Sequence, residues 1–204
     1  MATVLQDLNN ELAGVVDGVE RSLVRIESVG RGYGAGTVWH PEGLVITNAH
    51  VVGRGPLRVG LADGCVYPAR VRAYDARLDL AALWIDAHEL PTIAPGDSLQ
   101  LRPGEWVVAV GHPWGVAGAA TGGVVIGVGN VGPGQWGAPW QDRDLIAAGV
   151  HLRPGHSGGP MVDVQGQLVG INTMMHGPDV GLAVPAHVVK AFLRENLGSQ
   201  RMAA

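Results

Sequence analysis

Between residues 22 and 184 the chain alternates short apolar runs with turn-forming residues, and this pattern limits the folds it can adopt. The ten runs are Leu23–Val29, Leu44–Thr47, Leu57–Leu61, Cys65–Tyr74, Leu80–Ile85, Trp106–Val110, Val124–Val128, Met161–Val164, Gln167–Thr173 and Val180–Val184. Asp63-Gly64 and Gln165-Gly166 lie between runs and predict tight hairpin turns. At least ten short strands with few helices, in a chain with 32 glycines and 13 prolines, indicate an all-β barrel or sandwich.

Two helices are expected, one at each end of the strand-rich region. Residues 3–19 carry apolar side chains at alternating spacings of three and four, which predicts an amphipathic helix that packs on its own domain or contacts another subunit. A second helix is predicted from Pro185 to Leu197, because proline suits a first helical turn and Gly198 suits the end. The expected organisation is a helical segment (1–21), a two-lobed domain (22–197) divided near 86–104, and a tail (198–204).

Composition argues against several classes of protein. The net charge of −4, without a long run of either sign, disfavours a nucleic-acid binder. No stretch reaches the roughly 18 apolar residues of a membrane span, and no signal peptide is visible. The single cysteine, Cys65, excludes an intramolecular disulfide and is expected to be a small buried residue. The eight histidines lack a zinc-binding spacing, so no metal and no cofactor are predicted.

The most informative stretch is Arg153-Pro154-Gly155-His156-Ser157-Gly158-Gly159-Pro160. Glycines permit positive φ angles and let a substrate approach the main chain closely. A nucleophile loop has these needs, because the hydroxyl must stand clear while nearby N–H groups bind the oxyanion that forms during attack. The alternative is an ordinary glycine-rich turn.

A serine hydroxyl needs a base, and the base needs a partner that orients it. His50 follows the apolar strand Leu44–Thr47 where the pattern breaks, and Asp79 precedes the strand Leu80–Ile85. A carboxylate beside an apolar strand is costly to bury unless it is hydrogen-bonded, and an imidazole N–H is a suitable partner. A core histidine and a turn aspartate are the alternatives for these two residues. The order His, Asp, Ser is that of chymotrypsin-type enzymes.

The sequence resembles the HtrA/Deg branch of trypsin-like serine proteases. The resemblance rests on stretches in family order that cover nearly all of residues 22–197. They are Thr47-Asn48-Ala49-His50-Val51-Val52, Leu78-Asp79-Leu80-Ala81, Gly111-His112-Pro113-Trp114-Gly115, Pro154-Gly155-His156-Ser157-Gly158-Gly159-Pro160, Gly170-Ile171-Asn172-Thr173 and Gly181-Leu182-Ala183-Val184-Pro185. The resemblance implies two six-stranded antiparallel β-barrels with the active site in the cleft between them.

The resemblance also assigns roles to residues. It implies His50 as general base, Asp79 as its partner and Ser157 as nucleophile, with an oxyanion hole formed by Gly155 and Ser157 around His156. A substrate would pair as an extra strand with the Asn172–Met174 region, which includes Thr173. Leu152 and Met175 would line the specificity pocket, with His151 close by. No acidic residue lies just upstream of Ser157, so medium-sized apolar side chains such as Val, Leu or Ala are expected there rather than Lys or Arg.

Four features depart from the family pattern. His156 stands where the family usually has Asn, on what the sequence suggests is the leaving-group side, and Gly149 stands where it usually has an acidic residue. Family members often form trimers through N-terminal aromatic residues, whereas the first aromatic residue here is Tyr33. No PDZ domain fits after residue 197, which predicts a protease domain of a longer chain or a naturally short member. The compartment expected from the family is periplasmic or otherwise extracytoplasmic, and a full-length chain of this kind would be cytoplasmic.

The predicted function is that of a serine endopeptidase acting on unfolded or extended proteins through an acyl-enzyme. The sequence leaves two alternatives. An esterase elbow needs a helix after the serine and far more chain than the 47 residues (204 − 157) that follow Ser157. An inactive or conditionally active peptide-binding module of the same fold is the second, with Gly149 and His156 marking the altered site. The tryptophans Trp114, Trp136 and Trp140 are expected to pack around residues 112–140, with a peptide-binding shelf as the alternative.

Overall fold

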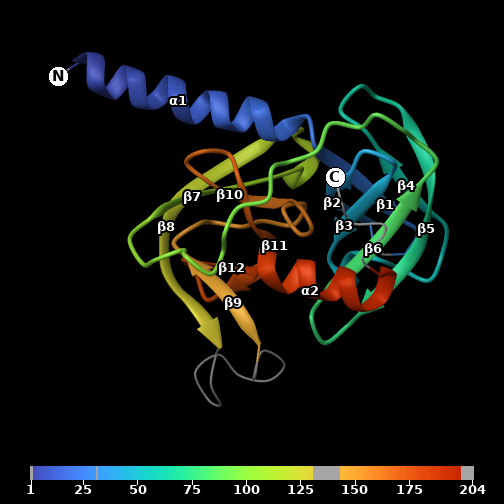
Figure 1. Cartoon of the computed structure of the whole chain (residues 1–204). Helices are drawn as coiled ribbons and strands as arrows, with labels where there is room; N and C mark the ends of the chain where they lie inside the picture. The colour runs from blue at the N-terminus through green and yellow to red at the C-terminus, as the bar shows by residue number, and fades with distance from the viewer. Residues whose placement is uncertain (1, 31, 131–142, 199–204) are drawn as a thin grey trace.

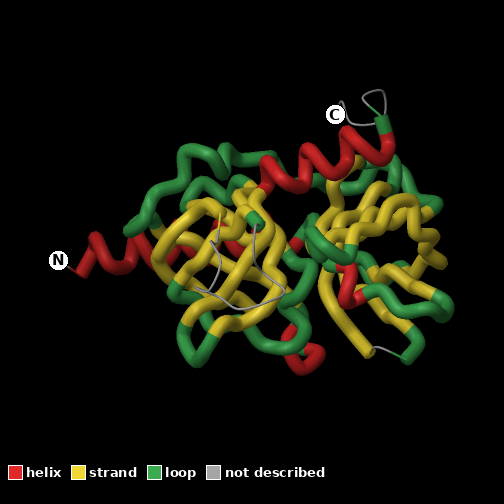
Figure 2. Tube along the Cα trace, turned by 90° about the horizontal axis from the view of Figure 1, so that it is seen from below, coloured by secondary structure: helices red, strands yellow, loops and turns green. Residues whose placement is uncertain are grey.

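The structure is a computed structural model that describes residues 2–30, 32–130 and 143–198. Within these residues, twelve strands form two closed six-stranded barrels whose strand pairs are all antiparallel. The barrels lie side by side in Figure 1 and again in Figure 2, where the molecule is seen from below with its connecting loops in green. The all-β, two-barrel prediction is confirmed.

The first barrel comprises strands β1–β6 in the order β1-β2-β3-β6-β5-β4. Their bounds are β1 Leu23–Ser28, β2 Gly32–His40, β3 Leu44–Thr47, β4 Leu57–Gly60, β5 Val66–Asp75 and β6 Leu80–Ile85. The second comprises β7–β12 in the order β10-β11-β12-β9-β8-β7. Their bounds are β7 Trp106–Gly111, β8 Ala119–Asn130, β9 Asp144–Ala148, β10 Pro160–Asp163, β11 Leu168–His176 and β12 Val180–Pro185. Short 3₁₀ turns, η1 Ala49–Val51 and η2 Pro113–Gly115, follow β3 and β7.

Strands β2 and β9 were not among the predicted runs. For β2 the physical reason is its glycine content. Its sequence begins Gly-Tyr-Gly-Ala-Gly, which is typical of a loop. A side chain at Gly34 would begin only 2.6 Å from Val51 Cγ1, and one at Gly36 only 2.8 Å from Ile26 Cδ1. These glycines therefore make room for close packing inside the barrel rather than marking a turn.

Cys65 was wrongly predicted to be buried. It is exposed at the β4–β5 hairpin, where Asp63 accepts a hydrogen bond from the Cys65 N–H at 2.8 Å. Gly64 has a φ of +88°, which confirms the turn itself. The apolar pattern misled here because the residue closes the turn and does not begin the inward-facing pattern of β5.

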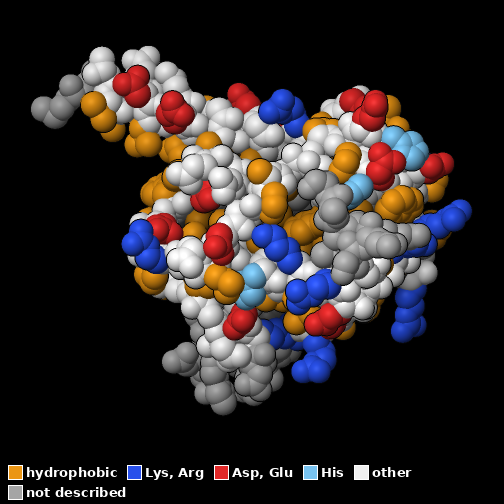
Figure 3. All heavy atoms as spheres, viewed as in Figure 1, with side chains coloured by type: hydrophobic (Ala, Val, Ile, Leu, Met, Phe, Trp, Pro, Cys, Tyr) orange, Lys and Arg blue, Asp and Glu red, His pale blue; other side chains and the backbone are white. Residues whose placement is uncertain are grey.

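The two helices are confirmed and differ in how they meet the barrels. Helix α1 (Ala2–Glu20) packs its C-terminal half on the second barrel, with Val19 against a cluster that includes Val108 and Val162. Its N-terminal half projects from the body (Figure 3), and Leu5 and Leu8 are exposed. Within the described part of the chain, neither helix has the length and apolar character needed to cross a bilayer.

Helix α2 (Ala186–Leu197) joins the barrels. Its buried side chain Phe192 packs in one cluster with Leu44 and Leu80 of the first barrel and Ile171 and Leu182 of the second. Figure 2 shows the helix running across both barrels. The relative position of the barrels, and hence of any site between them, depends on this shared core.

Phe192→Ala is expected to lower the free energy of unfolding by about 3–5 kcal/mol, because it leaves a cavity where the barrels meet. Phe192 is 1% exposed, so the lost contacts are not replaced by water. Urea unfolding monitored by tryptophan fluorescence measures the change. Val4→Ala, at a 68% exposed position of α1, is the control and should change stability by less than about 0.5 kcal/mol. Equal stability of Phe192→Ala and wild type would contradict the role given to this core.

Candidate active site

His50 and Asp79 meet in the first barrel although 29 residues separate them. Nδ1 of His50 lies 3.0 Å from Oδ1 and 2.9 Å from Oδ2 of Asp79, and the His50 backbone N–H also donates to Oδ1 at 3.0 Å. The His50 side chain is 41% exposed, whereas that of Asp79 is only 8% exposed. The imidazole therefore has one ring nitrogen facing a buried carboxylate while part of the ring remains open to solvent.

Asp79 is held in an uncommon backbone conformation. Its φ is +54°, which an aspartate tolerates better than most side chains. Its carbonyl oxygen accepts a hydrogen bond of 3.0 Å from Nδ2 of Asn48, two residues before His50. The segment before η1 thus fixes the backbone of the carboxylate that the histidine faces. Asn48 has no role in the sequence prediction, because only the folded barrel brings it to Asp79.

Thr173 links this pair to Ser157. From β11 of the second barrel, Thr173 Oγ1 donates to Asp79 Oδ2 at 2.5 Å. The Ser157 hydroxyl donates to the Thr173 carbonyl oxygen at 2.8 Å. In this arrangement Ser157 is bonded to the strand, and the described residues contain no hydrogen bond between its hydroxyl and His50. Thr173 was predicted to pair with a substrate backbone, and its side-chain contact with Asp79 was missed.

The loop that carries Ser157 is clamped between the barrels. The Ala35 N–H of β2 donates to the Ser157 carbonyl oxygen at 2.9 Å. A side chain at Gly158, where φ is +86°, would begin 2.1 Å from Ala35 O, and one at Gly159 would begin 2.2 Å from Val110 O. The glycines beside the serine are therefore required by backbone packing against both barrels.

Residues 153–156 form a tight turn that ends beside Ser157. The His156 N–H donates to Arg153 O at 2.9 Å, and Gly155 has a φ of +107°. Proline second and a positive-φ glycine third are the residues of a type II turn. Within the described residues, the N–H groups of Gly155 and Ser157 donate to no protein acceptor. Two main-chain donors are thus available close to the serine.

His156 does not lie on the leaving-group side, as the sequence suggested, because it is 3% exposed and turned into the protein. Burial lowers the pKa of His156, and the charge of Arg153 acts in the same direction. Burial is also the main cause of a lowered pKa at His112, with smaller contributions from the charges of Arg25 and His156. Both histidines therefore favour the neutral form.

The remaining predicted residues lie around β11. Leu152 is buried, and its N–H donates to Met175 Sδ at 3.1 Å, so the two predicted pocket residues are in contact. Strand β10 pairs with β11 only as far as Ile171, while β12 pairs along the other edge to His176. Asn172 is fully buried and bonds Val110 O and Pro160 O through Nδ2, whereas Met174 and Met175 are half-buried.

The remaining predictions concern three tryptophans and Gly149. Trp114 is 71% exposed and stacks under the Arg153 guanidinium at 4.9 Å, so the prediction that it packs in the core is wrong. Trp136 and Trp140 lie outside the described residues. Gly149 follows β9 and its N–H donates to Val124 O at 2.8 Å, which holds the backbone before the predicted pocket.

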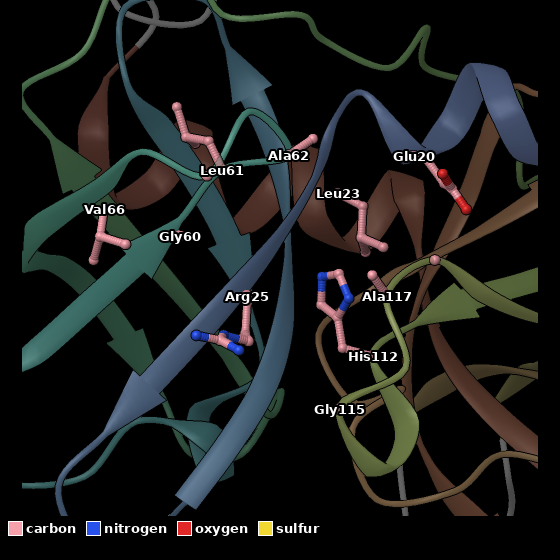
Figure 4. A pocket seen from close by; sticks show the side chains of 12 residues that line it. Glu20, Leu23, Arg25, Gly60, Leu61, Ala62, Val66, His112, Gly115 and Ala117 are labelled. Atoms are coloured by element: carbon pink, nitrogen blue, oxygen red, sulfur yellow. The ribbon is translucent and has the colours of Figure 1, made fainter.

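A cavity of about 320 Å³ lies at the junction of β1, the β4–β5 hairpin and the segment 112–118. Its lining includes Glu20, Arg25, Leu61 and His112, and none of His50, Asp79 or Ser157. Figure 4 shows the His112 ring turned toward Leu23 and Ala117. The His112 N–H donates to Gly155 O at 2.9 Å, so the cavity wall is connected to the turn before Ser157. Among the described residues, no group of three His, Cys, Asp or Glu side chains could hold a metal ion.

A second Ser–His–Asp contact lies elsewhere. Ser98 Oγ is 3.0 Å from His187 Nδ1, and His187 Nε2 is 3.4 Å from Asp144 Oδ2. Ser98 is 1% exposed, and its oxygen accepts the His187 backbone N–H at 3.0 Å. Ser98 thus caps the start of α2, and a buried capping oxygen cannot reach a polymer substrate.

The comparisons with known proteins agree with the fold. A family model described as "Trypsin-like peptidase domain" matches residues 34–171. Serine protease HTRA1B of Danio rerio is 34% identical over 198 residues, which is 92% of this chain and 41% of that protein. Serine protease HTRA4 of Homo sapiens is 35% identical over 91% of this chain and 41% of that protein. A putative serine protease HhoB of Synechocystis is 34% identical over 82% of this chain and 40% of that protein.

The chain spans about two fifths of the length of these curated relatives. The family match includes the positions of His50, Asp79 and Ser157, which hydrogen bonds through Thr173 connect in the structure. The chain belongs to the trypsin-like peptidase domain family and is homologous to HtrA serine proteases over most of its length.

Proposed function

We propose that this chain is a serine endopeptidase with Ser157 as nucleophile, His50 as general base and Asp79 as the carboxylate that orients the base. The observation that carries the proposal is the convergence on Thr173. Its hydroxyl donates to Asp79, which accepts from His50, and its carbonyl oxygen accepts from Ser157. A solvent-open imidazole backed by a buried carboxylate is the arrangement that acyl transfer needs.

The reaction follows from these positions. The Ser157 hydroxyl turns from Thr173 O to His50, which takes its proton as Oγ attacks the substrate carbonyl carbon. The Gly155 and Ser157 N–H groups, which have no acceptor among the described residues, would bind the oxyanion. His50 then gives its proton to the leaving amine and an acyl-enzyme remains. Water, deprotonated by His50, attacks the ester carbon and releases the acid and the Ser157 hydroxyl.

An extended polypeptide is the proposed substrate. The main-chain groups of Asn172 are bonded to Gly158 and Gly159, and beyond them the described residues place no strand on the β10 side of β11, so a substrate backbone can be added there as a strand. The Leu152–Met175 contact offers an apolar surface without a carboxylate, which supports cleavage after medium-sized apolar residues. Mass spectrometry of the fragments of an unfolded model protein measures this preference. Cleavage mainly after Lys or Arg would contradict it.

A conditionally active peptide-binding module is the second candidate function, and one observation favours it. The Ser157 hydroxyl is bonded to Thr173 O at 2.8 Å and must exchange this partner before His50 can activate it. If that exchange requires a bound peptide, the chain without substrate would hold peptides but react slowly. The two candidates differ in whether Ser157 reacts in the absence of peptide.

Covalent labelling tests the proposal. A fluorophosphonate probe is expected to modify wild type at Ser157 and to leave Ser157→Ala and His50→Ala unmodified, because only an activated serine reacts. Ser98→Ala is the matched control: it removes the other histidine-bonded serine and should be labelled like wild type. Labelling of wild type only after a peptide is added favours the conditional module. Binding of peptides without labelling under either condition would refute the endopeptidase.

A further inference from the structure

The His156 side chain closes the turn that precedes Ser157. The ring nitrogen Nδ1 accepts a hydrogen bond from the Arg153 backbone N–H at 3.0 Å. The backbone N–H of His156 donates to the Arg153 carbonyl oxygen at 2.9 Å. Two hydrogen bonds therefore join the ends of the Pro154-Gly155 turn, one through the main chain and one through the imidazole. Because the residue is 3% exposed, water does not compete for these contacts.

The contact defines the chemical form of the ring. In the 3.0 Å contact the backbone N–H donates, so Nδ1 is the unprotonated nitrogen and the neutral ring carries its proton on Nε2. Nδ1 also lies 3.3 Å from the Arg153 carbonyl oxygen, a longer contact to which only the other tautomer could donate. That Nε2 is buried and has no partner among the described residues. A buried donor without a partner costs stability. Burial of Nε2 is therefore a cost, and the described hydrogen-bond contacts of the ring are those of Nδ1 with Arg153.

The turn is confined on its other side by backbone. The His112 N–H donates to Gly155 O, and a side chain at Gly155 would begin 2.4 Å from His112 O. A side chain at Gly111 would begin 2.6 Å from the Cα of His156. The end of β7 thus holds one face of the turn, and the imidazole bond holds its beginning at Arg153. Together these contacts set the direction in which the Gly155 N–H points.

We propose that His156 is a positioning residue whose Nδ1, by accepting the Arg153 N–H, holds the Gly155 amide in place for the oxyanion. The inference rests on the proposed endopeptidase function and deepens it. His156 touches neither the substrate nor the reacting atoms; it acts through the turn. Charged or titratable groups nearby are Arg153 on the same loop, His112 after β7 and Arg25 of β1, which acts on His112. Burial and the charge of Arg153 oppose a protonated ring, whose Nδ1 could no longer accept.

Two substitutions separate an acceptor from mere packing. In His156→Asn, the amide oxygen can take the place of Nδ1 and accept the Arg153 N–H. In His156→Leu, the site stays filled but has no acceptor. We expect His156→Leu to lose about 100-fold in kcat, the size of effect seen when one oxyanion donor is lost, with KM nearly unchanged. We expect His156→Asn to restore most of kcat.

His187→Leu is the matched control, because it also removes a histidine that is hydrogen-bonded at 3.0 Å, here a half-buried one in α2. It should lower the melting temperature without lowering kcat. Thermal melts of all variants show that each is folded under the assay conditions. If His156→Leu is too unstable, His156→Gln, whose amide lies one methylene too far out, is used as the variant with a displaced acceptor and should lose kcat relative to His156→Asn.

The outcomes separate the inference from the proposed function. A wild-type chain that neither reacts with a fluorophosphonate nor cleaves peptides would refute the endopeptidase itself. An active wild type with folded His156→Leu of equal kcat would refute only the positioning role. Equal losses in folded His156→Leu and His156→Asn would show that the acceptor is not what matters. A kcat loss in His156→Leu with recovery in His156→Asn supports the proposal.

Discussion

Ser157→Ala is expected to lower kcat for an internally quenched peptide by about 10⁶-fold, to the level of catalysis that remains without a nucleophile. The hydroxyl would form and break the covalent bond to the substrate, so nothing else in the site replaces it. The fold should survive, because the side chain makes one hydrogen bond, to Thr173 O, and the Ser157 carbonyl keeps its bond from Ala35. Steady-state cleavage rates and thermal melts measure the two quantities.

Three variants make the serine experiment specific. His50→Ala should show a similar loss, and the double variant should be no worse than either single one, because base and nucleophile act as a unit. Ser98→Ala should retain its kcat, although it removes the oxygen that caps α2 and costs about 1 kcal/mol of stability. A Ser157→Ala protein that retains full cleavage would show that the activity belongs to another residue or to a contaminant.

Asp79→Asn is expected to lower kcat by about 10⁴-fold with little change in KM. The carboxylate accepts from the His50 ring, the His50 N–H and the Thr173 hydroxyl. An amide has a single acceptor oxygen, and its NH₂ group would face His50 Nδ1 and favour the wrong tautomer of the base. Asparagine tolerates the φ of +54° at this position, so the backbone need not change.

Asp144→Asn is the matched control for this substitution. It alters another aspartate that faces a histidine, because Asp144 lies 3.4 Å from His187 at a partly exposed site, and it should leave kcat unchanged. Initial rates over a range of substrate concentrations give kcat and KM for both variants. If Asp79→Asn retained more than about a tenth of wild-type kcat, Asp79 would not orient the base in the way proposed.

The sequence predicted elements well where the signal is local. Strands β3 and β6 match the predicted runs residue for residue, because both are continuous apolar segments bounded by turn residues. β2 was missed because its glycines resemble those of a loop. Glycine is required there because Val51 and Ile26, which belong to other segments, leave no room for a side chain. Trp114 was misplaced because exposure of a large aromatic residue cannot be inferred from its type.

In the candidate site, too, the sequence predicted some features and only the fold produced the others. His50, Asp79 and Ser157 could be selected from residue type, order and glycine context, but the contacts among them could not. The bond from Thr173 to Asp79 joins residues 94 apart in the two barrels, and the bond from Asn48 to the Asp79 carbonyl depends on how β3 and β6 pair. The burial of His156 likewise follows from the packing of its loop against β7.

By itself, the sequence determined the all-β class, the two terminal helices and the three residues on which the chemistry is proposed to depend. These follow from period, turn chemistry and residue type, which act over a few neighbouring positions. The tertiary structure alone decided that Thr173 and Asn48 hold those residues and that His156 is buried beside Ser157. Their contacts depend on the closure of two barrels around a shared core and on burial that removes water, and neither is encoded within any one segment.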